Sequence, residues 1–159
     1  EEDSPLQGDI KILGVGKGRV SQASLADEMV DLFGAIEKIG GTNRFKEFER
    51  NGKRFFLNYF KAIQATFPKA WAGRKYSIKT GAALRAFIRV SPDAMTRSRQ
   101  LKSDPFDHFG IREAIKPWGE RVGEGRFETD GEWRRKLAGG TRGTVELLAR
   151  ELRDAMKVP

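Results

Sequence analysis

Hydrophobic residues recur every three or four positions over residues 24–39, which is the spacing of one face of an α-helix. Ser21 or Ser24 would precede the first turn, and the glycine pair at 40–41 would end the helix as a left-handed C-cap. The sequence therefore predicts a helix here whose buried stripe is Leu25, Met29, Leu32, Ile36 and Ile39.

A second helical pattern runs from about Thr42 to Phe67, with a possible interruption at Asn51–Gly52. Pro68 should end it, because residues that precede proline avoid helical angles. Residues 67–71 would then form a tight turn or a short helical stub. The apolar face of this helix consists of Phe56, Tyr59, Phe60, Ile63 and Phe67, and the basic residues Arg50, Lys53, Arg54 and Lys61 lie largely off it.

Three further helix starts are predicted from capping residues. Thr80 resembles an N-cap, after a short extended piece at Tyr76–Lys79. Ser91–Pro92 and Asp104–Pro105 each place a capping side chain before a proline at the first helical position. Each pair therefore predicts the start of a new helix, and residues 117–119 (Pro-Trp-Gly) would end the last of these elements.

The C-terminal segment gives the clearest helix, because Val145, Leu148, Leu152 and Met156 step by three, four and four. Residues 119–132 are glycine-rich and charged and predict a loop. The first twenty residues predict an arm with a small hairpin, since Ile10 and Ile12 alternate with polar residues. The expected fold is all-α or α-rich, with residues 1–20 as an arm and residues 21–159 as a compact helical domain that folds with it.

Composition narrows the possible functions. The chain has 159 residues and no cysteine, which excludes disulfides, thiolate metal sites and a cysteine nucleophile. Its apolar runs are too short for a membrane span, no signal peptide is visible, and we expect a cytoplasmic protein. Because residue 1 is glutamate rather than methionine, we expect the chain to be an excised piece of a longer protein.

The net charge of +8 is concentrated in the middle of the chain. Residues 41–100 contain 14 basic and 3 acidic residues, whereas residues 1–40 contain 4 and 8, and residues 101–159 contain 12 and 11. Clustered positive charge raises the local potential and attracts polyanions. The alternative is a solvated basic surface without a ligand, but the clustering favours nucleic acid as the partner.

Catalytic and metal-binding patterns are sparse. His108 is the single histidine, which rules out a usual zinc site in this chain, and we expect it at the surface or at its boundary. Acidic residues within 120–132 could form a metal site only if they converged. The segment 139–144 lacks the Walker lysine, so it indicates a helix cap or a phosphate-docking turn. We assign the chain no catalytic residue, no metal and no cofactor, although an enzyme built on residues 104–132 remains a third alternative.

Basic and aromatic residues interleave over residues 71–80, where arginine and lysine could contact phosphates while an exposed ring stacks on a base. The alternative, which we favour, is that Trp71 and Tyr76 pack into the core and only the charges face outward. No motif that reads base sequence is evident, so backbone phosphates are the expected contacts. The predicted nucleic-acid-binding residues are Arg50, Lys53, Arg54, Lys61, Arg74, Lys75, Lys79, Arg85 and Arg89, with Arg97 and Arg99 as outer contacts.

The run at 56–64 (FLNYFKAIQ), followed by Phe67–Pro68, Trp71, residues 76–81 (YSIKTG) and Ala83–Leu84, resembles the C-terminal half of DGQHR-domain proteins. A pattern of the form NYFKAI…FP…W…TG…AL recurs in that family. Residues 4–8, residues 18–21 and the closing glycine-rich turn and helix resemble it as well. The Asp-Gly-Gln-His-Arg motif itself is absent, so no catalytic residue can be transferred.

The resemblance implies a bacterial protein related to the ParB-like members of DNA-modification and defence clusters, among them a regulator of DNA phosphorothioation. It implies duplex DNA as partner and a DNA-binding accessory or regulatory role for this C-terminal portion. The alternative is a protein-interaction module that docks onto the missing ParB-like N-terminal half or onto a partner enzyme.

Overall fold

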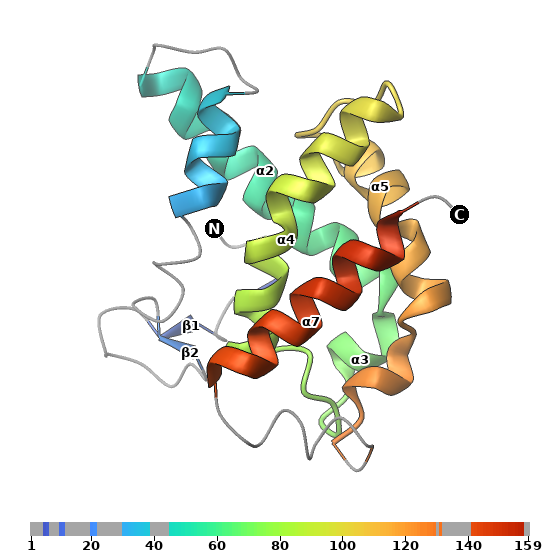
Figure 1. Cartoon of the computed structure of the whole chain (residues 1–159). Helices are drawn as coiled ribbons and strands as arrows, with labels where there is room; N and C mark the ends of the chain where they lie inside the picture. Colours follow the sequence, from blue (N-terminus) through green and yellow to red (C-terminus); the bar gives the residue numbers. More distant parts are fainter. Residues whose placement is uncertain are drawn as a thin grey trace.

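The chain folds into a bundle of helices, in agreement with the predicted all-α or α-rich class (Figure 1). The computed structural model describes residues 5–6, 10–11, 20–21, 30–38, 45–129, 131 and 141–157. Residues 30–38 form a helix, and the remaining elements follow in chain order: α2 (Phe45–Thr66), α3 (Pro68–Ala72), α4 (Gly81–Gln100), α5 (His108–Arg121), the 3₁₀ turn η1 (Glu124–Phe127) and α7 (Thr141–Met156).

The N-terminal arm contributes two strands of two residues each, β1 (Ile10–Lys11) and β2 (Val20–Ser21). They pair in parallel, with Ile10 opposite Val20, whereas the strands of the predicted hairpin would be antiparallel. Strands joined by a tight turn must run in opposite directions, and eight residues separate these two. Leu6 from the same arm is buried in the core.

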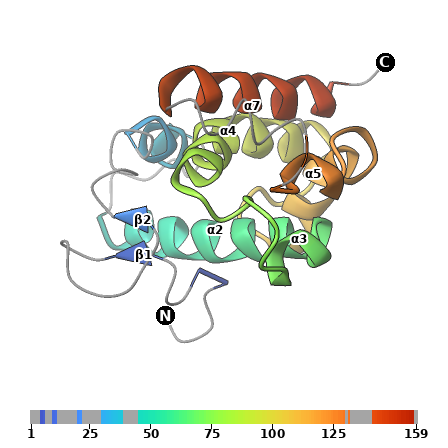
Figure 2. The same ribbon diagram turned by 90° about the horizontal axis from the view of Figure 1, so that it is seen from below.

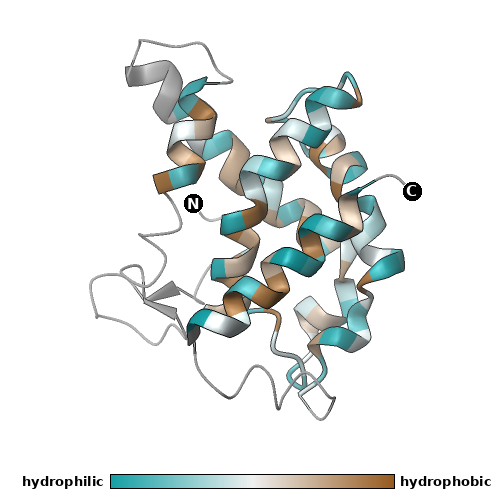
Figure 3. Ribbon diagram, viewed as in Figure 1, coloured by the Kyte–Doolittle hydropathy of each residue, from teal (hydrophilic) through white to brown (hydrophobic). Residues whose placement is uncertain are grey.

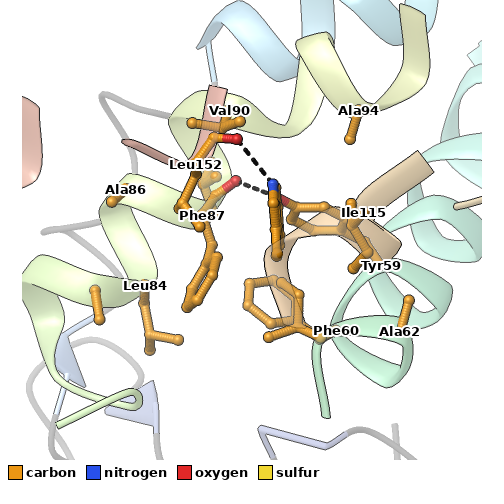
Figure 4. Close-up of a cluster of buried hydrophobic side chains, with 14 of the residues drawn as sticks. Tyr59, Phe60, Ala62, Leu84, Ala86, Phe87, Val90, Ala94, Ile115 and Leu152 are labelled. Carbon is orange, nitrogen blue, oxygen red and sulfur yellow. Dashed lines mark hydrogen bonds between the residues drawn. The ribbon is translucent and has the colours of Figure 1, made fainter. Parts of the chain in front are cut away.

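The helices form layers around one core. In Figure 2, α2 occupies one side, α7 the opposite side, and α4 and α5 lie between them. Ring contacts among Tyr59, Phe60, Phe87 and Trp118, together with two hydrogen bonds, connect the layers (Figure 4). The buried indole of Trp118 on α5 donates to the Leu152 carbonyl oxygen on α7 at 2.9 Å, and the Tyr59 hydroxyl on α2 donates to the Phe87 carbonyl oxygen on α4. Polar atoms of both buried rings are therefore satisfied, as burial requires.

Pro68 ends α2 as predicted and begins α3, the expected helical stub. Thr80 also caps α4 as predicted, because its hydroxyl oxygen accepts from the Ala83 amide at 3.4 Å. Asn51–Gly52 does not interrupt α2, which is continuous through both residues. The helix continues past these two residues because Phe55, Tyr59 and the neighbouring rings form a continuous buried face beyond them.

The prediction that Ser91–Pro92 begins a new helix is wrong, since both residues lie inside α4. Proline lacks the amide that would bond the carbonyl four residues earlier, which is that of Ile88. The hydroxyl of Ser91, fully buried, donates to this Ile88 oxygen instead. The serine that looked like a cap thus replaces the hydrogen bond that proline removes, and the helix continues.

The other two proline signals were also misread. Asp104 caps a turn rather than a helix: its carboxylate accepts from the Phe106 amide at 2.9 Å, and α5 begins later, at His108, with Asp107 as its N-cap. Pro117 lies inside α5, which runs on to Arg121. Burial of Trp118 against three other helices outweighs the cost of the proline.

The C-terminal helix is confirmed, with Val145, Leu148, Leu152 and Met156 all buried. Of the first predicted stripe, Leu32 and Ile36 are buried on the helix 30–38, and Leu25, Met29 and Ile39 lie outside the described residues. Within the predicted loop 119–132, residues 119–121 belong to α5 and Glu124–Phe127 form η1.

Burial of Tyr59 makes stability sensitive to alkaline pH. Desolvation, with a smaller contribution from the Asp93 carboxylate, raises the pKa of Tyr59 well above its ordinary value of 10.0. The unfolded chain therefore ionises first, so the stabilisation is complete below pH 10 and is lost as pH rises above it. We expect the free energy of unfolding to fall above that pH by about 1.4 kcal/mol per pH unit from this group. Denaturant titrations should show that Tyr59→Phe lacks this part of the slope.

Candidate nucleic-acid interface

The eleven predicted basic residues fall into three groups in the structure. Four lie on α2, three in the turn between α3 and α4, and four on α4. They do not share one surface. The core sides of α2 and α4 face each other through the bond between Tyr59 and Phe87, so their outward sides point away from each other (Figure 2).

The α2 group consists of Arg50, Lys53, Arg54 and Lys61, which lie within one helical stripe opposite the buried rings. Arg54 is held by acidic residues of the α4–α5 connection: its Nη2 lies 3.1 Å from the Asp104 carboxylate and 3.9 Å from that of Asp107. Nearby, the Asn58 amide donates to the Phe106 carbonyl oxygen at 2.8 Å. Part of this group's charge is thus used to dock the connection onto α2.

The turn group is Arg74, Lys75 and Lys79. Arg74 and Lys75 are exposed, whereas Trp71 is buried and the Tyr76 ring packs against the core, as expected for the two rings. The Lys79 ammonium lies 5.6 Å from the centre of the Trp71 ring, a cation–π distance.

Backbone bonds fix this turn to the segment after α5. Tyr76 and Glu128 form an antiparallel bridge. The Thr129 amide donates to the Lys75 oxygen at 2.9 Å, and the Ser77 amide donates to the Phe127 oxygen at 2.7 Å. The bridge brings the backbone of Glu128, an exposed acidic residue, next to the turn.

The α4 group is Arg85, Arg89, Arg97 and Arg99, on the outward side of a helix whose other side is buried. Arg85, Arg89 and Arg99 follow helical spacing along one stripe, with Arg97 at its edge toward α7. Arg97 donates to the Gln100 side-chain oxygen at 3.3 Å.

The structure adds basic residues that the charge map of the sequence missed. Helix α7 lies beside α4 and runs in the same direction, so that Asp93 on α4 meets Arg153 on α7 at 3.1 Å (Figure 1). Hydrophilic and hydrophobic residues alternate along α7, as its mixed colouring in Figure 3 shows, so the helix has a buried side and an outward polar side. The basic residues on that side are Arg142, Arg150, Arg153 and Lys157.

We call the outward sides of these two helices the α4–α7 face. Its basic residues are Arg85, Arg89, Arg97, Arg99, Arg142, Arg150, Arg153 and Lys157, and its acidic residues are Asp93, Glu146 and Asp154. The excess is five positive charges. Two of the three acids are engaged in ion pairs within the face: Asp93 with Arg153, and Asp154 with Lys157 at 2.7 Å. The hydrogen bond from Lys157, followed by further positive charges, lowers the pKa of Asp154.

Of the acidic residues of 120–132 that the structure describes, Glu124 has a structural role. The Glu124 carboxylate accepts from the Lys69 amide at 2.7 Å and from the Ala70 amide at 3.4 Å, which caps α3. Within the described part of the chain, no group of three or more His, Asp or Glu side chains could hold a metal ion; Asp130 and Glu132 lie outside that part.

His108 is the first residue of α5 and is half-buried, at the boundary where we expected it. Thr141 begins α7, and Gly139 and Gly140 of the predicted phosphate-docking turn lie outside the described residues. No helix within the described ranges is both long enough and apolar enough to cross a bilayer.

In comparisons with known proteins, the chain matches no family model, no curated protein and no solved structure.

Proposed function

We propose that this domain binds duplex DNA through its backbone phosphates, and that the α4–α7 face makes the main contacts. The domain would serve as an accessory or regulatory part of a bacterial DNA-modification or defence protein, acting in the cytoplasm where such DNA lies. The resemblance of residues 56–84 to DGQHR-domain proteins supports the biological setting. The charge distribution on the folded surface supports the chemistry.

One observation carries the proposal: two adjacent helices place eight basic and three acidic residues on one outward face. Two phosphodiester strands present a regular array of single negative charges. Arginine suits such an array because its planar guanidinium donates two parallel hydrogen bonds to a phosphate. Seven of the eight basic residues of the face are arginines, so the face supplies the preferred donor for this ligand.

The α4–α7 face is favoured over the α2 side because it carries more basic residues, eight against the four of the α2 group. On α2, Arg54 is shared between Asp104 and Asp107. The turn that follows is bridged to Glu128. On the α4–α7 face, Arg99, Arg142 and Arg150 are exposed, and within the described part of the chain none of them forms an ion pair with an acidic side chain.

The test is a salt titration of duplex binding with two matched triple variants. The first is Arg99→Gln, Arg142→Gln and Arg150→Gln, on the proposed face. The second is Arg50→Gln, Arg74→Gln and Lys75→Gln, which removes the same charge from exposed positions elsewhere. Fluorescence anisotropy with random-sequence duplex gives the binding constant at each salt concentration.

For the parent chain, the logarithm of the binding constant should fall against the logarithm of salt with a slope of about −4 to −5, from about five phosphate contacts. The first variant should flatten this slope by about two to three units and weaken all sequences equally. The second should change it by less than about one unit. A salt-independent interaction, or equal loss in both variants, contradicts the proposed face.

A protein-interaction module is the second candidate, favoured by the α2 side, whose basic stripe lies on the opposite surface and could meet an acidic protein. This second function applies if the parent chain does not bind duplex DNA and if the second triple variant, but not the first, loses binding to a partner enzyme.

A further inference from the structure

A groove of about 330 Å³ lies between the C-terminal halves of α4 and α7. Asp93, Arg97 and Gln100 line it from α4, and Arg153, Met156 and Lys157 line it from α7. Its volume lies at the lower end of the range for small-molecule sites, about 300–1,000 Å³. Three cations and one carboxylate therefore surround a hollow large enough for a small ligand.

The cations of this groove keep most of their donors for a ligand. Arg153 uses its Nε on the Asp93 carboxylate at 3.1 Å, and Arg97 uses one Nη1 hydrogen on the Gln100 oxygen at 3.3 Å. A guanidinium has five N–H donors in a fixed fork. Within the described part of the chain these are the only partners of the two guanidiniums, and both Nη groups of Arg153 remain for a second acceptor.

The same internal bonds hold the donors in place. Asp93 orients Arg153 through its Nε, and Gln100 accepts from the Nη1 of Arg97 at the exposed surface, so part of the ordering of these side chains precedes ligand entry. The residues that line the groove carry an excess of two positive charges, and one of its cations, Lys157, is also paired with Asp154 at 2.7 Å. A phosphomonoester carries about −1.5 to −2 charge at neutral pH and three acceptor oxygens, which matches this excess better than a single carboxylate does.

We propose that this groove is a binding site for a phosphomonoester group. The group could belong to a free nucleotide or to the terminal phosphate of a nucleic-acid strand, and both present the same dianion. A phosphodiester within a duplex carries one charge and two non-bridging oxygens rather than three, so it fits the open parts of the α4–α7 face rather than this hollow. Arg97, Arg153 and Lys157 belong to both the groove and the α4–α7 face, and a phosphomonoester would occupy the groove whether or not the face binds duplex DNA.

The first experiment titrates the chain with adenosine 5′-monophosphate, followed by amide shifts in ¹⁵N NMR, with adenosine and inorganic phosphate as companions. We expect saturable shifts confined to residues 93–100 and 153–157 with the monophosphate and with inorganic phosphate, and none with adenosine. Arg97→Gln and Arg153→Gln should each weaken binding about tenfold or more, because each removes a charge-assisted hydrogen bond. Arg97→Lys should recover only part of the loss, since lysine keeps the charge without the fork.

Arg50→Gln and Arg74→Gln are the controls and should leave the dissociation constant unchanged, since both residues are exposed and neither lines the groove. A second arm compares oligonucleotides with a 5′-phosphate and a 5′-hydroxyl. Stronger binding of the phosphorylated strand, lost in Arg153→Gln, assigns the site to strand ends. Equal binding of both strands, with the mononucleotide still bound, assigns it to free nucleotides.

Three results would overturn the proposal: equal binding of adenosine and its monophosphate, shifts outside the groove, or unchanged affinity in both arginine variants. Melting curves of each variant establish that the fold is retained. If the parent chain binds the monophosphate but not duplex DNA, the proposed function is refuted and the groove proposal stands. If the parent chain binds duplex DNA but not the monophosphate, the groove proposal is refuted and the proposed function stands.

Discussion

Replacing Trp118 by alanine should lower the free energy of unfolding by about 3–5 kcal/mol, the range for removing a large buried aromatic ring. Trp118 has no exposed surface. Its ring lies 6.4 Å from that of Tyr59 on α2 and 5.8 Å from that of Phe87 on α4, and its indole donates to Leu152 on α7. One side chain on α5 therefore contacts three other helices, and its removal leaves a cavity that none of them can fill alone.

Two companion variants separate the causes of this loss. Trp118→Phe keeps most of the apolar volume but leaves the Leu152 oxygen without its indole donor, so it should cost less than alanine does, about 1–3 kcal/mol. Phe109→Ala removes a ring of similar kind from the same helix at a site that is 68 % exposed, and it should change stability by no more than about 0.5 kcal/mol. Urea unfolding followed by circular dichroism measures all three. Equal losses at positions 109 and 118 would show that the core had been misassigned.

Trp118 also shows where the sequence was insufficient. Proline directly after serine or aspartate, or two residues before glycine, is a local signal, and at residues 91–92, 104–105 and 117–119 it predicted helix boundaries. The structure keeps two of these prolines inside helices: the Ser91 hydroxyl bonds the Ile88 oxygen within α4, and Trp118, next to Pro117, is held by packing against other helices. The first contact is local but serves helix continuation as well as capping, and the second depends on tertiary packing that local spacing does not encode.

Periodicity was the stronger guide. The stripes of α2 and α7 were predicted from spacing alone, since side chains three and four apart necessarily share a helical face. Leu148 and Leu152 are buried as that spacing required. The Thr80 cap was likewise predictable, because its bond to the Ala83 amide is formed between residues close in the chain.

The candidate interface was only half predictable. Counting charges by segment identified residues 41–100 as basic. The same count gave a net charge near zero for residues 101–159, because the acidic residues of that segment offset its basic residues, those of α7 included. In the fold, Arg142 and Arg150 come from that balanced segment and join the arginines of α4 on one face. Conversely, Arg50 and Arg89 fall in the same basic segment of the sequence but lie on different helices, α2 and α4, whose core sides face each other. Pairing of helices, which no local pattern encodes, determines which charges add.

The connection between α4 and α5 provides the last prediction. Gly110, in the first turn of α5, is buried beneath this connection, and a methyl group added there would lie 2.2 Å from the Asp104 carbonyl oxygen and 3.0 Å from the Ser98 hydroxyl. Two hydrogen bonds restrict movement of the Asp104 carbonyl group away from α5. The Ser98 hydroxyl donates to the Asp104 oxygen, and the neighbouring Ser103 amide donates to the Ser98 carbonyl oxygen at 2.9 Å. Gly110→Ala should therefore lower the free energy of unfolding by about 1–3 kcal/mol or more, as overpacking does.

The matched control is Gly34→Ala, on the helix 30–38, where an added methyl group meets nothing within 4 Å. Alanine favours the helix over glycine by up to about 1 kcal/mol, so this variant should be slightly more stable than the parent. The two substitutions add the same group and should shift the midpoint of thermal unfolding in opposite directions. If Gly110→Ala is neutral, the connection is free to move away from α5, and the ion pair of Arg54 with Asp104, which docks it onto α2 at 3.1 Å, does not hold it in place.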